Sequence, residues 1–434
     1  MSLNYQQKVC FDAAMRGENI FISGPGGVGK SFVLRAITEE FRQRKTAFRV
    51  AASTGVAALN VGGSTIHSLL GTAIKSTVTQ AQTLLGTRPF QQACDRLRFV
   101  QTIIVDEVSM LSGDYIEMMN FWLQQVRSSF SPFGGCQIIF CGDFLQLPPV
   151  EKGKEPQWKY AFNAPAWNGA KFKVVDLHFS FRQEDQTFVN ALNMVRFGSY
   201  PKEVRKVFRP CIGRALDNPT HLVATNKEAN NINFTRLREF EGQEYKAKPR
   251  FEISNPAISN NQDWADDLKS KMLRDSLVDS PLRLKVGVPV LMLKNTASYV
   301  NGNRGTVEKI VADKTTNQIE TIVVKLDTGI YVDVMRVSWE KKDGDGKTEM
   351  LMYHFPIRLA WAITIHKSQG LTLDNVEIDL SNGFAYGQAY VALSRMKSLE
   401  GLSLTDAIDP AIVKADPELV EFYDRAVITR GGDI

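Results

Sequence analysis

The sequence lacks the apolar segments that a membrane-spanning or exported chain would need. No stretch approaches the roughly 18–20 consecutive apolar residues of a transmembrane helix, and residues 1–8 contain no apolar core of a signal peptide. Cysteine is scarce, and its spacing forms neither a CxxC pair nor a disulfide framework: Cys10, Cys94, Cys136, Cys141 and Cys211. We therefore expect a cytoplasmic protein in a reducing compartment, without a membrane partner.

A strong charge of one sign is also missing. The 434 residues include 52 Lys+Arg and 47 Asp+Glu, a formal net charge of +5. Residues 405–434 hold seven acidic and three basic side chains, which leaves 49 basic against 40 acidic in the rest. This balance permits a nucleic-acid partner without indicating one. With 44% hydrophobic and 23% charged residues, the composition excludes intrinsic disorder and collagen-like repetition.

Short apolar runs followed by small or polar residues, and then by helical periodicity, recur along the chain. The runs are 19–22, 48–52, 102–105, 137–140 and 174–177, and later 221–224, 376–380 and 402–404. Alternation of this kind predicts βαβ units and parallel sheets, and hence an α/β fold with two lobes. Because ligands gather at the carboxyl ends of parallel strands, the residues after each run are candidates for function.

Two stretches depart from this pattern. Residues 282–354 show short strand-like segments with glycine-rich turns, which predict a small antiparallel barrel inserted in the second lobe. Residues 67–98 have no evident strand and predict a smaller helical or loop module within the first lobe. The expected domains are a first lobe at 1–176 with its module at about 67–98, a second lobe at 177–284 and 355–434, and the inserted domain at 285–354.

A complete phosphate-loop pattern follows the first apolar run. GPGGVGKS at 24–31 fits GxxxxGK[ST] and opens a helical segment. Backbone N–H groups of such a loop wrap the β-phosphate of ATP, the lysine reaches the β- and γ-phosphates, and the serine hydroxyl is a ligand for Mg²⁺. The expected nucleotide-binding residues are Gly24, Gly26, Gly27, Val28, Gly29, Lys30 and Ser31.

Two carboxylates end the apolar run that begins at 102. Asp106 stands where a carboxylate holds Mg²⁺ beside the phosphates. Glu107 follows it and can take a proton from the water that attacks the γ-phosphate, which indicates hydrolysis rather than transfer to another substrate. After the next run, Gln146 lies in GDFLQLPP at 142–149. From the residues alone, Gln146 is either a γ-phosphate sensor or part of an ordinary loop.

Taken together, these segments resemble the superfamily 1 DNA helicases of the 5′-to-3′ branch, and within them the petite-integration-frequency (Pif-type) helicases, which are related to RecD-like and Dda helicases. The resemblance runs from residue 3 to about 409. It rests on the segments 52–58, 62–67, 106–111 with a helix ending at Arg127, 141–150, 181–183, 365–374 and 387–395. It implies a minimal helicase core of bacterial or phage type, with two RecA-like P-loop NTPase lobes and an SH3-like β-barrel inserted in the second.

The same resemblance implies roles for single residues. Gln7 reads the adenine, Gln146 senses the γ-phosphate, and Gly370 belongs to the nucleotide site. Arg182 and Arg395 act as arginine fingers that stabilise charge on the transferring phosphoryl group. Single-stranded DNA crosses residues of both lobes, namely Thr54, Gly55, His67, Thr225, Asn226, His366, Lys367 and Ser368.

The resulting hypothesis is an ATP-dependent DNA helicase that moves 5′-to-3′ on single-stranded DNA and unwinds duplexes, with Mg²⁺ as cofactor. Its partners would be single-stranded DNA and tailed or forked duplexes, with G-quadruplex DNA as a further candidate, and it would act as a monomer. One alternative is a single-strand translocase or RecD-like motor subunit that unwinds little alone. The other is a nucleotide switch that binds DNA without hydrolysis, which Glu107 and the two arginines argue against.

Overall fold

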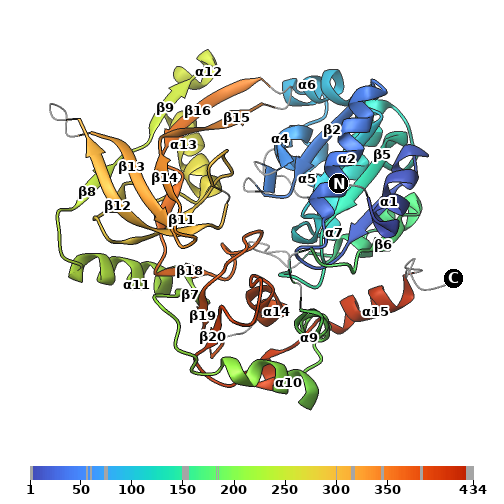
Figure 1. Ribbon diagram of the computed structural model, residues 1–434. Coiled ribbons are helices and arrows are strands. Elements are labelled where there is room, and N and C mark those ends of the chain that lie inside the picture. The colour runs from blue at the N-terminus through green and yellow to red at the C-terminus, as the bar shows by residue number, and fades with distance from the viewer. Residues whose placement is uncertain are drawn as a thin grey trace. The chain divides into compact units, whose positions relative to one another are not determined.

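The computed structural model describes residues 3–54, 57–58, 61–72, 77–148, 156–181, 183, 185–299, 301–313, 318–343, 347–381 and 385–426. Within it the chain divides into two compact units (Figure 1). Unit 1 comprises Met1–Arg182, Lys342–Lys347 and Ala415–Ile434, and unit 2 comprises Gln183–Lys341 and Thr348–Lys414.

Unit 1 is built on a six-stranded sheet in the order β3-β2-β4-β5-β1-β6, in which every pairing is parallel. The strands are β1 Ile20–Ser23, β2 Phe48–Ala52, β3 Ser64–Thr65, β4 Thr102–Asp106, β5 Gln137–Cys141 and β6 Lys173–Asp176. The five apolar runs of the first lobe thus form β1, β2, β4, β5 and β6. Since the strands are parallel, the residues that follow them meet at one edge.

Alternation along β1 divides the core of unit 1 between two faces of the sheet. Ile20 and Ile22 pack in one cluster with helices α1 (Tyr5–Met15) and α2 (Lys30–Gln43). Phe21 points to the other face, where its ring centroid lies 5.5 Å from that of Trp167 in α8. Among the fully described helices of the unit are also α4 Ile66–Leu70, α5 Val78–Gln82, α6 Arg88–Leu97, α7 Gly113–Arg127, α8 Pro165–Ala170 and α15 Pro417–Arg425.

Unit 2 contains a second parallel sheet, of four strands in the order β18-β7-β19-β20. These are β7 Thr220–Val223, β18 Ala362–Thr364, β19 Val376–Ile378 and β20 Leu402–Leu404. The helices α9 Gln186–Arg196, α10 Lys202–Phe208, α11 Asn226–Glu239 and α14 Gln388–Leu393 belong to this part of the chain. Asn233 of α11 fastens the helix to the sheet, because its side chain donates to the carbonyl of Ala362 and accepts from the N–H of the same residue.

The antiparallel part of unit 2 is larger than 285–354. One sheet has the order β14-β13-β12-β11-β17, with β11 Pro289–Met292, β12 Arg304–Ala312, β13 Ile319–Leu326, β14 Tyr331–Val334 and β17 Ile357–Leu359. A second joins β15 Val337–Lys342 and β16 Thr348–His354 to β9 Arg250–Ile253, and a third pairs β8 Tyr245–Ala247 with β10 Leu282–Leu284. Helices α12 Pro256–Ser259 and α13 Gln262–Ser276 lie between β9 and β10 in the chain. One apolar core spans from Leu237 to Trp361, so strands on both sides of the expected insertion belong to it.

The C-terminal segment also differs from the expectation that 355–434 belongs to the second lobe. Ala415–Ile434 groups with unit 1, because α15 packs there with an aromatic side chain. The ring of Phe422 stacks on Phe162 with centroids 4.2 Å apart. An acidic tail that carried no recognised motif is therefore part of the first compact unit.

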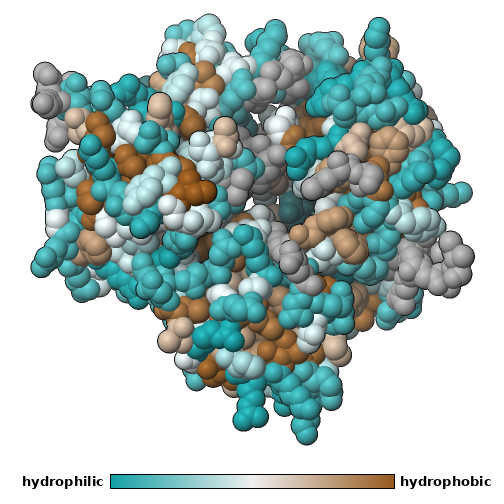
Figure 2. Space-filling model, in the orientation of Figure 1, coloured by the Kyte–Doolittle hydropathy of each residue, from teal (hydrophilic) through white to brown (hydrophobic). Residues whose placement is uncertain are grey.

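The visible surface in Figure 2 is mainly hydrophilic, with hydrophobic residues in scattered groups. Among the described residues, no helix combines the length and the apolar character that crossing a membrane requires.

Candidate nucleotide and DNA sites

The phosphate loop connects β1 to α2 through glycines in backbone conformations that other residues rarely adopt. Gly24, Gly27 and Gly29 have φ values of 142°, 89° and 83°. A Cβ atom at Gly24 would lie 2.5 Å from the carbonyl oxygen of Leu177, so glycine is required there for space as well as for backbone angle. Gly26 and Val28 complete the loop, and Ser31 is exposed in the first turn of α2. The loop therefore presents a helix N-terminus, where an anion is favoured.

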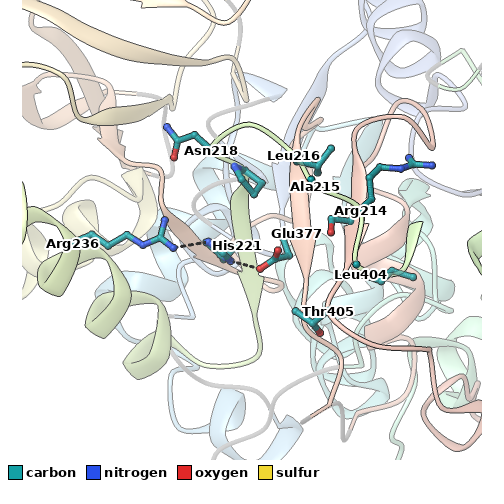
Figure 3. Close-up of a pocket in the computed structure, with 12 residues that line it drawn as sticks. Arg214, Ala215, Leu216, Asn218, His221, Arg236, Glu377, Leu404 and Thr405 are labelled. Carbon is teal, nitrogen blue, oxygen red and sulfur yellow. Dashed lines mark hydrogen bonds and ion pairs between the residues drawn. The ribbon is translucent and has the colours of Figure 1, made fainter. Parts of the chain in front are cut away.

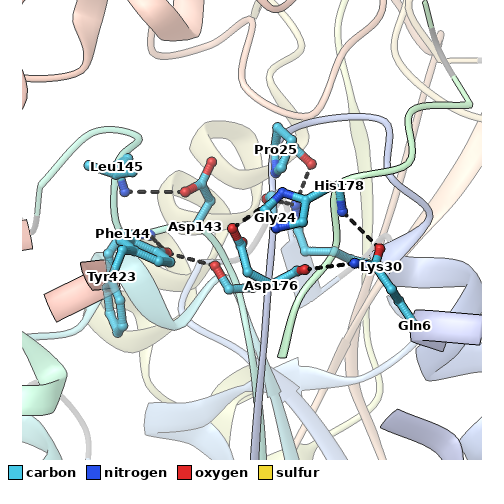
Figure 4. Close-up of polar contacts among 11 residues, drawn as sticks. Gln6, Gly24, Pro25, Lys30, Asp143, Phe144, Leu145, Asp176, His178 and Tyr423 are labelled. Atoms are coloured by element: carbon cyan, nitrogen blue, oxygen red, sulfur yellow. Dashed lines mark hydrogen bonds and ion pairs between the residues drawn. The ribbon is translucent and has the colours of Figure 1, made fainter. Parts of the chain in front are cut away.

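The amine of Lys30 lies against the loop. Its Nζ donates to the carbonyls of Gly24 at 2.6 Å and Pro25 at 2.9 Å (Figure 4). Both contacts are to neutral oxygens, and the charge of Lys30 is available to a phosphate that enters the loop. Lys30 thus lies at the first residue of α2 with its amine against the phosphate loop.

Gln7 reaches the same loop from α1. Its side chain is 1% exposed and its Oε1 accepts from the N–H of Asn4, but Nε2 has no hydrogen-bond partner among the described residues. A Cβ atom at Gly29 would lie 2.6 Å from this Nε2. A buried amide donor left open beside a phosphate loop fits an adenine, whose ring nitrogens accept hydrogen bonds.

Phe181 is a candidate site residue to which the sequence analysis gave no role. Its backbone N–H donates to the carbonyl of Gly27 at 2.9 Å, and its ring would lie 3.3 Å from a Cβ atom at Gly29. The ring is 57% exposed although it is large and apolar. An open aromatic face beside Gln7 suits a flat base. The signal was present, because Phe181 begins the family segment 181–183, in which only Arg182 was given a role.

Asp106 and Glu107 stand at the end of β4. Burial raises the pKa of Asp106, and the backbone N–H of Glu107 and the thiol of Cys141 counteract part of that rise by donating to the carboxylate. Glu107 has φ 53°, a left-handed conformation that a glutamate adopts at a cost. Strain of this kind is typical of functional sites, where it aims a side chain that a relaxed strand end would direct elsewhere.

The loop after β5 carries Asp143 and Gln146, the third set of candidate residues at this edge. Asp143 is fully buried and its Oδ1 accepts from the N–H of Leu145 at 3.2 Å. Gln146 is 5% exposed, and its Nε2 lies 3.5 Å from Asp143 Oδ2. Since β4, β5 and β1 are neighbours in the sheet, the loop that bears Gln146 lies at the same edge as Asp106 and the phosphate loop.

In unit 2, four predicted DNA residues follow the adjacent strands β7 and β18. Thr225 and Asn226 are exposed after β7, and Thr225 caps α11 by accepting from the N–H of Glu228. His366 is exposed after β18, and Lys367 is half-buried beside it. Desolvation lowers the pKa of both His366 and Lys367. The sheet thus brings these four residues to one edge.

Ser368 does not share that exposure. It is fully buried, and its hydroxyl donates to the carbonyl of Ile365 at 2.7 Å. In this conformation the hydroxyl closes the turn after β18, and a DNA contact at Ser368 stays a prediction. Gly370, at φ 81°, follows in the same exposed turn.

Arg395 is also buried, at 1% exposure. Its Nε donates to the carbonyl of Val391 at 2.9 Å and its Nη2 to the hydroxyl of Ser394 at 2.8 Å. Its guanidinium is thus held by its own unit, and a finger role requires those bonds to be exchanged for bonds to phosphate.

Of the remaining predicted nucleotide and DNA residues, two are described in unit 1 and two lie outside the residues that the structure describes. Thr54 accepts from the N–H of Ala57 at 3.2 Å, and the ring of His67 in α4 packs 4.6 Å from that of Tyr115. Arg182 and Gly55 lie outside the described residues.

A polar pocket of about 640 Å³ occurs elsewhere in unit 2 (Figure 3). Its floor includes His221, Glu377 and Ser403, which stand in one row across β7, β19 and β20. His221 links Glu377, 2.8 Å from its Nδ1, to Arg236, 3.0 Å from its Nε2. The lining includes none of the predicted nucleotide or DNA residues.

Comparison with known proteins agrees with this geometry. Residues 2–206 match the model of the PIF1-like helicase family, and residues 267–310 match the 2B domain of the DNA helicase Pif1. The ATP-dependent DNA helicase Pif1 of Bdellovibrio bacteriovorus is 34% identical over 98% of this chain and 92% of its own length. The human ATP-dependent DNA helicase PIF1 is 34% identical over 99% of this chain, which spans 64% of the human protein.

Solved structures extend the likeness to the fold. Bacteroides Pif1 in complex with ADP-AlF4 is similar with a TM-score of 0.79 and 27% identity, over 98% of this chain and 97% of that one. The same helicase bound to single-stranded DNA gives a TM-score of 0.67 and 29% identity, over the same shares. The resemblance inferred from the sequence is confirmed, and the chain belongs to the PIF1-like helicase family.

Proposed function

We propose that this chain is an ATP-dependent DNA helicase that moves 5′-to-3′ along single-stranded DNA and unwinds duplexes. The observation that carries the proposal is the joint placement of a complete phosphate loop, Asp106 and Glu107 at strand ends on the same edge of the parallel sheet of unit 1. The structures of Bacteroides Pif1 with ADP-AlF4 and with single-stranded DNA support the same two ligands for this chain.

In the proposed site, the phosphates lie on the loop N–H groups and Lys30. Ser31 and Asp106 would hold Mg²⁺, which supplies charge neutralisation on the β- and γ-phosphates when bound. Two oxygen ligands from the protein suit this ion, which keeps several waters and takes further oxygens from a nucleotide. Gln7 recognises the adenine edge and Phe181 offers a face for stacking.

Hydrolysis then falls to Glu107, which accepts a proton from the attacking water, while Gln146 contacts the γ-phosphate. The parallel sheets of the two units are the two RecA-like lobes of this proposal, and the antiparallel part of unit 2 is the inserted SH3-like domain. Arg182, at the end of the first segment of unit 1, and Arg395, in unit 2, contact the γ-phosphate together only when the lobes close, so that hydrolysis depends on closure. Thr54, Gly55, His67, Thr225, Asn226, His366 and Lys367 hold the strand through its backbone without reading its sequence.

The test is an ATPase and unwinding assay of the purified chain on duplexes with one 5′ or one 3′ tail. We expect phosphate release to rise with single-stranded DNA and unwinding to require the 5′ tail. Lys30→Ala should abolish both, because the phosphates lose their principal cation, whereas exposed Lys45→Ala should leave them unchanged. Unwinding from the 3′ tail contradicts the polarity, and stimulated ATPase without unwinding indicates a translocase.

A further inference from the structure

Helix α15 is anchored on unit 1 by polar bonds at its first turn and by an aromatic side chain in its last. Asp416 caps the helix, and its Oδ2 accepts from Lys159 Nζ at 2.6 Å and from the hydroxyl of Tyr160 at 2.7 Å. Phe422 enters the aromatic cluster on the α8 side of the sheet, 5.6 Å from the ring of Phe144. These contacts fix the helix in both position and rotation.

The next residue, Tyr423, brings a hydroxyl into the interior of the same unit. The side chain is 1% exposed, and its oxygen lies 2.6 Å from the hydroxyl of Ser23. The same oxygen accepts from the backbone N–H of Phe144 at 3.3 Å (Figure 4). One phenol oxygen therefore bridges two chain segments that are 279 and 400 residues away in the sequence.

Both bonded groups belong to segments that carry the nucleotide site. Ser23 is the last residue of β1 and directly precedes Gly24, where the phosphate loop begins. Phe144 follows Asp143 and stands two residues before Gln146, in the loop after β5. Strands β1 and β5 are neighbours, so the Tyr423 hydroxyl ties the loops at their two carboxyl ends to each other.

We propose that Tyr423 is a positioning residue for ATP hydrolysis, which holds the loop after β5 in register with the phosphate loop. The inference rests on the proposed function above. Tyr423 touches no phosphate in this role. It acts through Ser23 and Phe144, so that Lys30 and Gln146 are held at fixed positions along the same nucleotide.

Geometry explains why the hydroxyl matters more than the ring. Ser23 is fully buried and Phe144 is 1% exposed, so water has no access to replace the bonds. Phenylalanine at 423 keeps the packing of α15 but leaves two buried polar groups without this partner. The two loops then shift to find other partners for these groups, or the distance between the loops becomes variable. Because Gln146 is misplaced in either case, the turnover of ATP should fall more than the affinity for ATP.

The experiment compares Tyr423→Phe with Tyr160→Phe in the full chain, using DNA-stimulated ATPase at 25 °C. Each variant removes one buried tyrosine hydroxyl that bonds α15 to the rest of unit 1. Only Tyr423→Phe removes a bond to the segments that carry the phosphate loop and Gln146. We expect kcat to fall about three- to tenfold in Tyr423→Phe with a change in KM for ATP below about twofold. Tyr160→Phe should keep the wild-type kcat. Its melting temperature should fall by about as much as that of Tyr423→Phe.

A second pair of variants tests the bridge itself. Ser23→Ala should lower kcat in the same direction, and the double variant with Tyr423→Phe should be less impaired than the product of the two single effects. Wild-type kcat in Tyr423→Phe, or equal losses of kcat in Tyr423→Phe and Tyr160→Phe, would overturn the positioning role. Failure of the wild-type chain to hydrolyse ATP would instead overturn the proposed function, so the two failures are distinguishable.

Discussion

Both units end their parallel strands in functional candidates, but the two edges are built differently. In unit 1 the edge is closed: Asp106 is 9% exposed, Asp143 is fully buried, and Glu107 is held in a left-handed conformation. In unit 2 the edge is open, with Thr225 and His366 exposed. Arg395, the charged group expected to act on phosphate, lies inside unit 2.

The difference follows from what each edge has to do. Charge stabilisation at a reacting phosphate is most effective where water is excluded and the protein groups are already oriented, which burial and strain provide. A strand that must slide needs shallow and replaceable contacts, which exposed hydroxyl, amide and imidazole groups supply. The comparison predicts that changes in unit 1 lower the rate of ATP hydrolysis strongly. Changes at the edge of unit 2 should weaken binding of single-stranded DNA by a smaller factor.

The largest effect is expected from Glu107→Gln. The amide cannot accept the proton of the attacking water, so DNA-stimulated kcat should fall by about 10²–10⁴-fold. Binding of ATP and DNA should persist, because the phosphate loop is unchanged. Single-turnover phosphate release and equilibrium binding measure the two separately, with the exposed Glu39→Gln on α2 as control. A variant that still turns over ATP at the wild-type rate removes Glu107 from the reaction.

The next largest effect is expected at Arg395, a residue of unit 2 that would take part in hydrolysis and so contradict a strict division between the two edges. As a finger, Arg395→Ala should lower DNA-stimulated turnover about a hundredfold or more while ATP affinity stays within several-fold. As a purely structural residue of unit 2, it should lower the melting temperature and leave the kcat of the folded protein unchanged. Stimulated turnover measured beside thermal unfolding decides between these outcomes, and Arg395→Lys shows whether the guanidinium geometry is needed.

A smaller effect is expected at the open edge. His366→Ala should weaken single-stranded DNA binding about five- to tenfold, because an exposed ring that meets a base or the backbone is lost. His366→Phe should retain more of the affinity if stacking is the contact. Fluorescence anisotropy with a labelled oligonucleotide measures both, and KM for ATP without DNA should not change. A loss of ATP affinity that matches the loss of DNA affinity would contradict the assignment of DNA binding to unit 2 and nucleotide binding to unit 1.

The smallest effect is a pH dependence of unit 2. Burial lowers the pKa of His354, and partial desolvation lowers that of the exposed His366. Desolvation also lowers the pKa of His221, against the opposing influence of Glu377. Below the usual histidine pKa of about 6.5 the unfolded chain binds protons that the folded unit does not, so stability declines as the pH falls. We expect unfolding of unit 2 to occur about 2–4 °C lower at pH 5.5 than at pH 7.5.

Hydrogen exchange resolved along the chain measures this effect in each unit. Peptides around His354, which is fully buried and bonded through Nε2 to the carbonyl of Asp279, should lose protection first. His354→Gln removes one of the three protonation sites and should reduce the dependence. Equal loss of protection in β1 and β5 of unit 1 would show that the effect is not specific to unit 2.

Local pattern was sufficient for the closed edge of unit 1. GPGGVGKS predicts its own geometry because Gly24, Gly27 and Gly29 have backbone angles that other residues rarely adopt. Asp106 and Glu107 were predicted as site residues because the apolar run that forms β4 ends at them. The open edge was harder to predict, because the same segment holds an exposed His366 and a buried Ser368 two residues later, and only the turn geometry separates them.

The sequence by itself determined the phosphate-loop pattern, the paired carboxylates at the end of an apolar run, and membership of the PIF1-like helicase family. Tertiary structure decided which distant segments lie against these motifs. Phe181 acquires a place only when it packs beside Gly29, and Tyr423 only when α15 lies on unit 1. The physical reason is that a contact between residues 400 positions apart depends on how the layers pack, which no local spacing records.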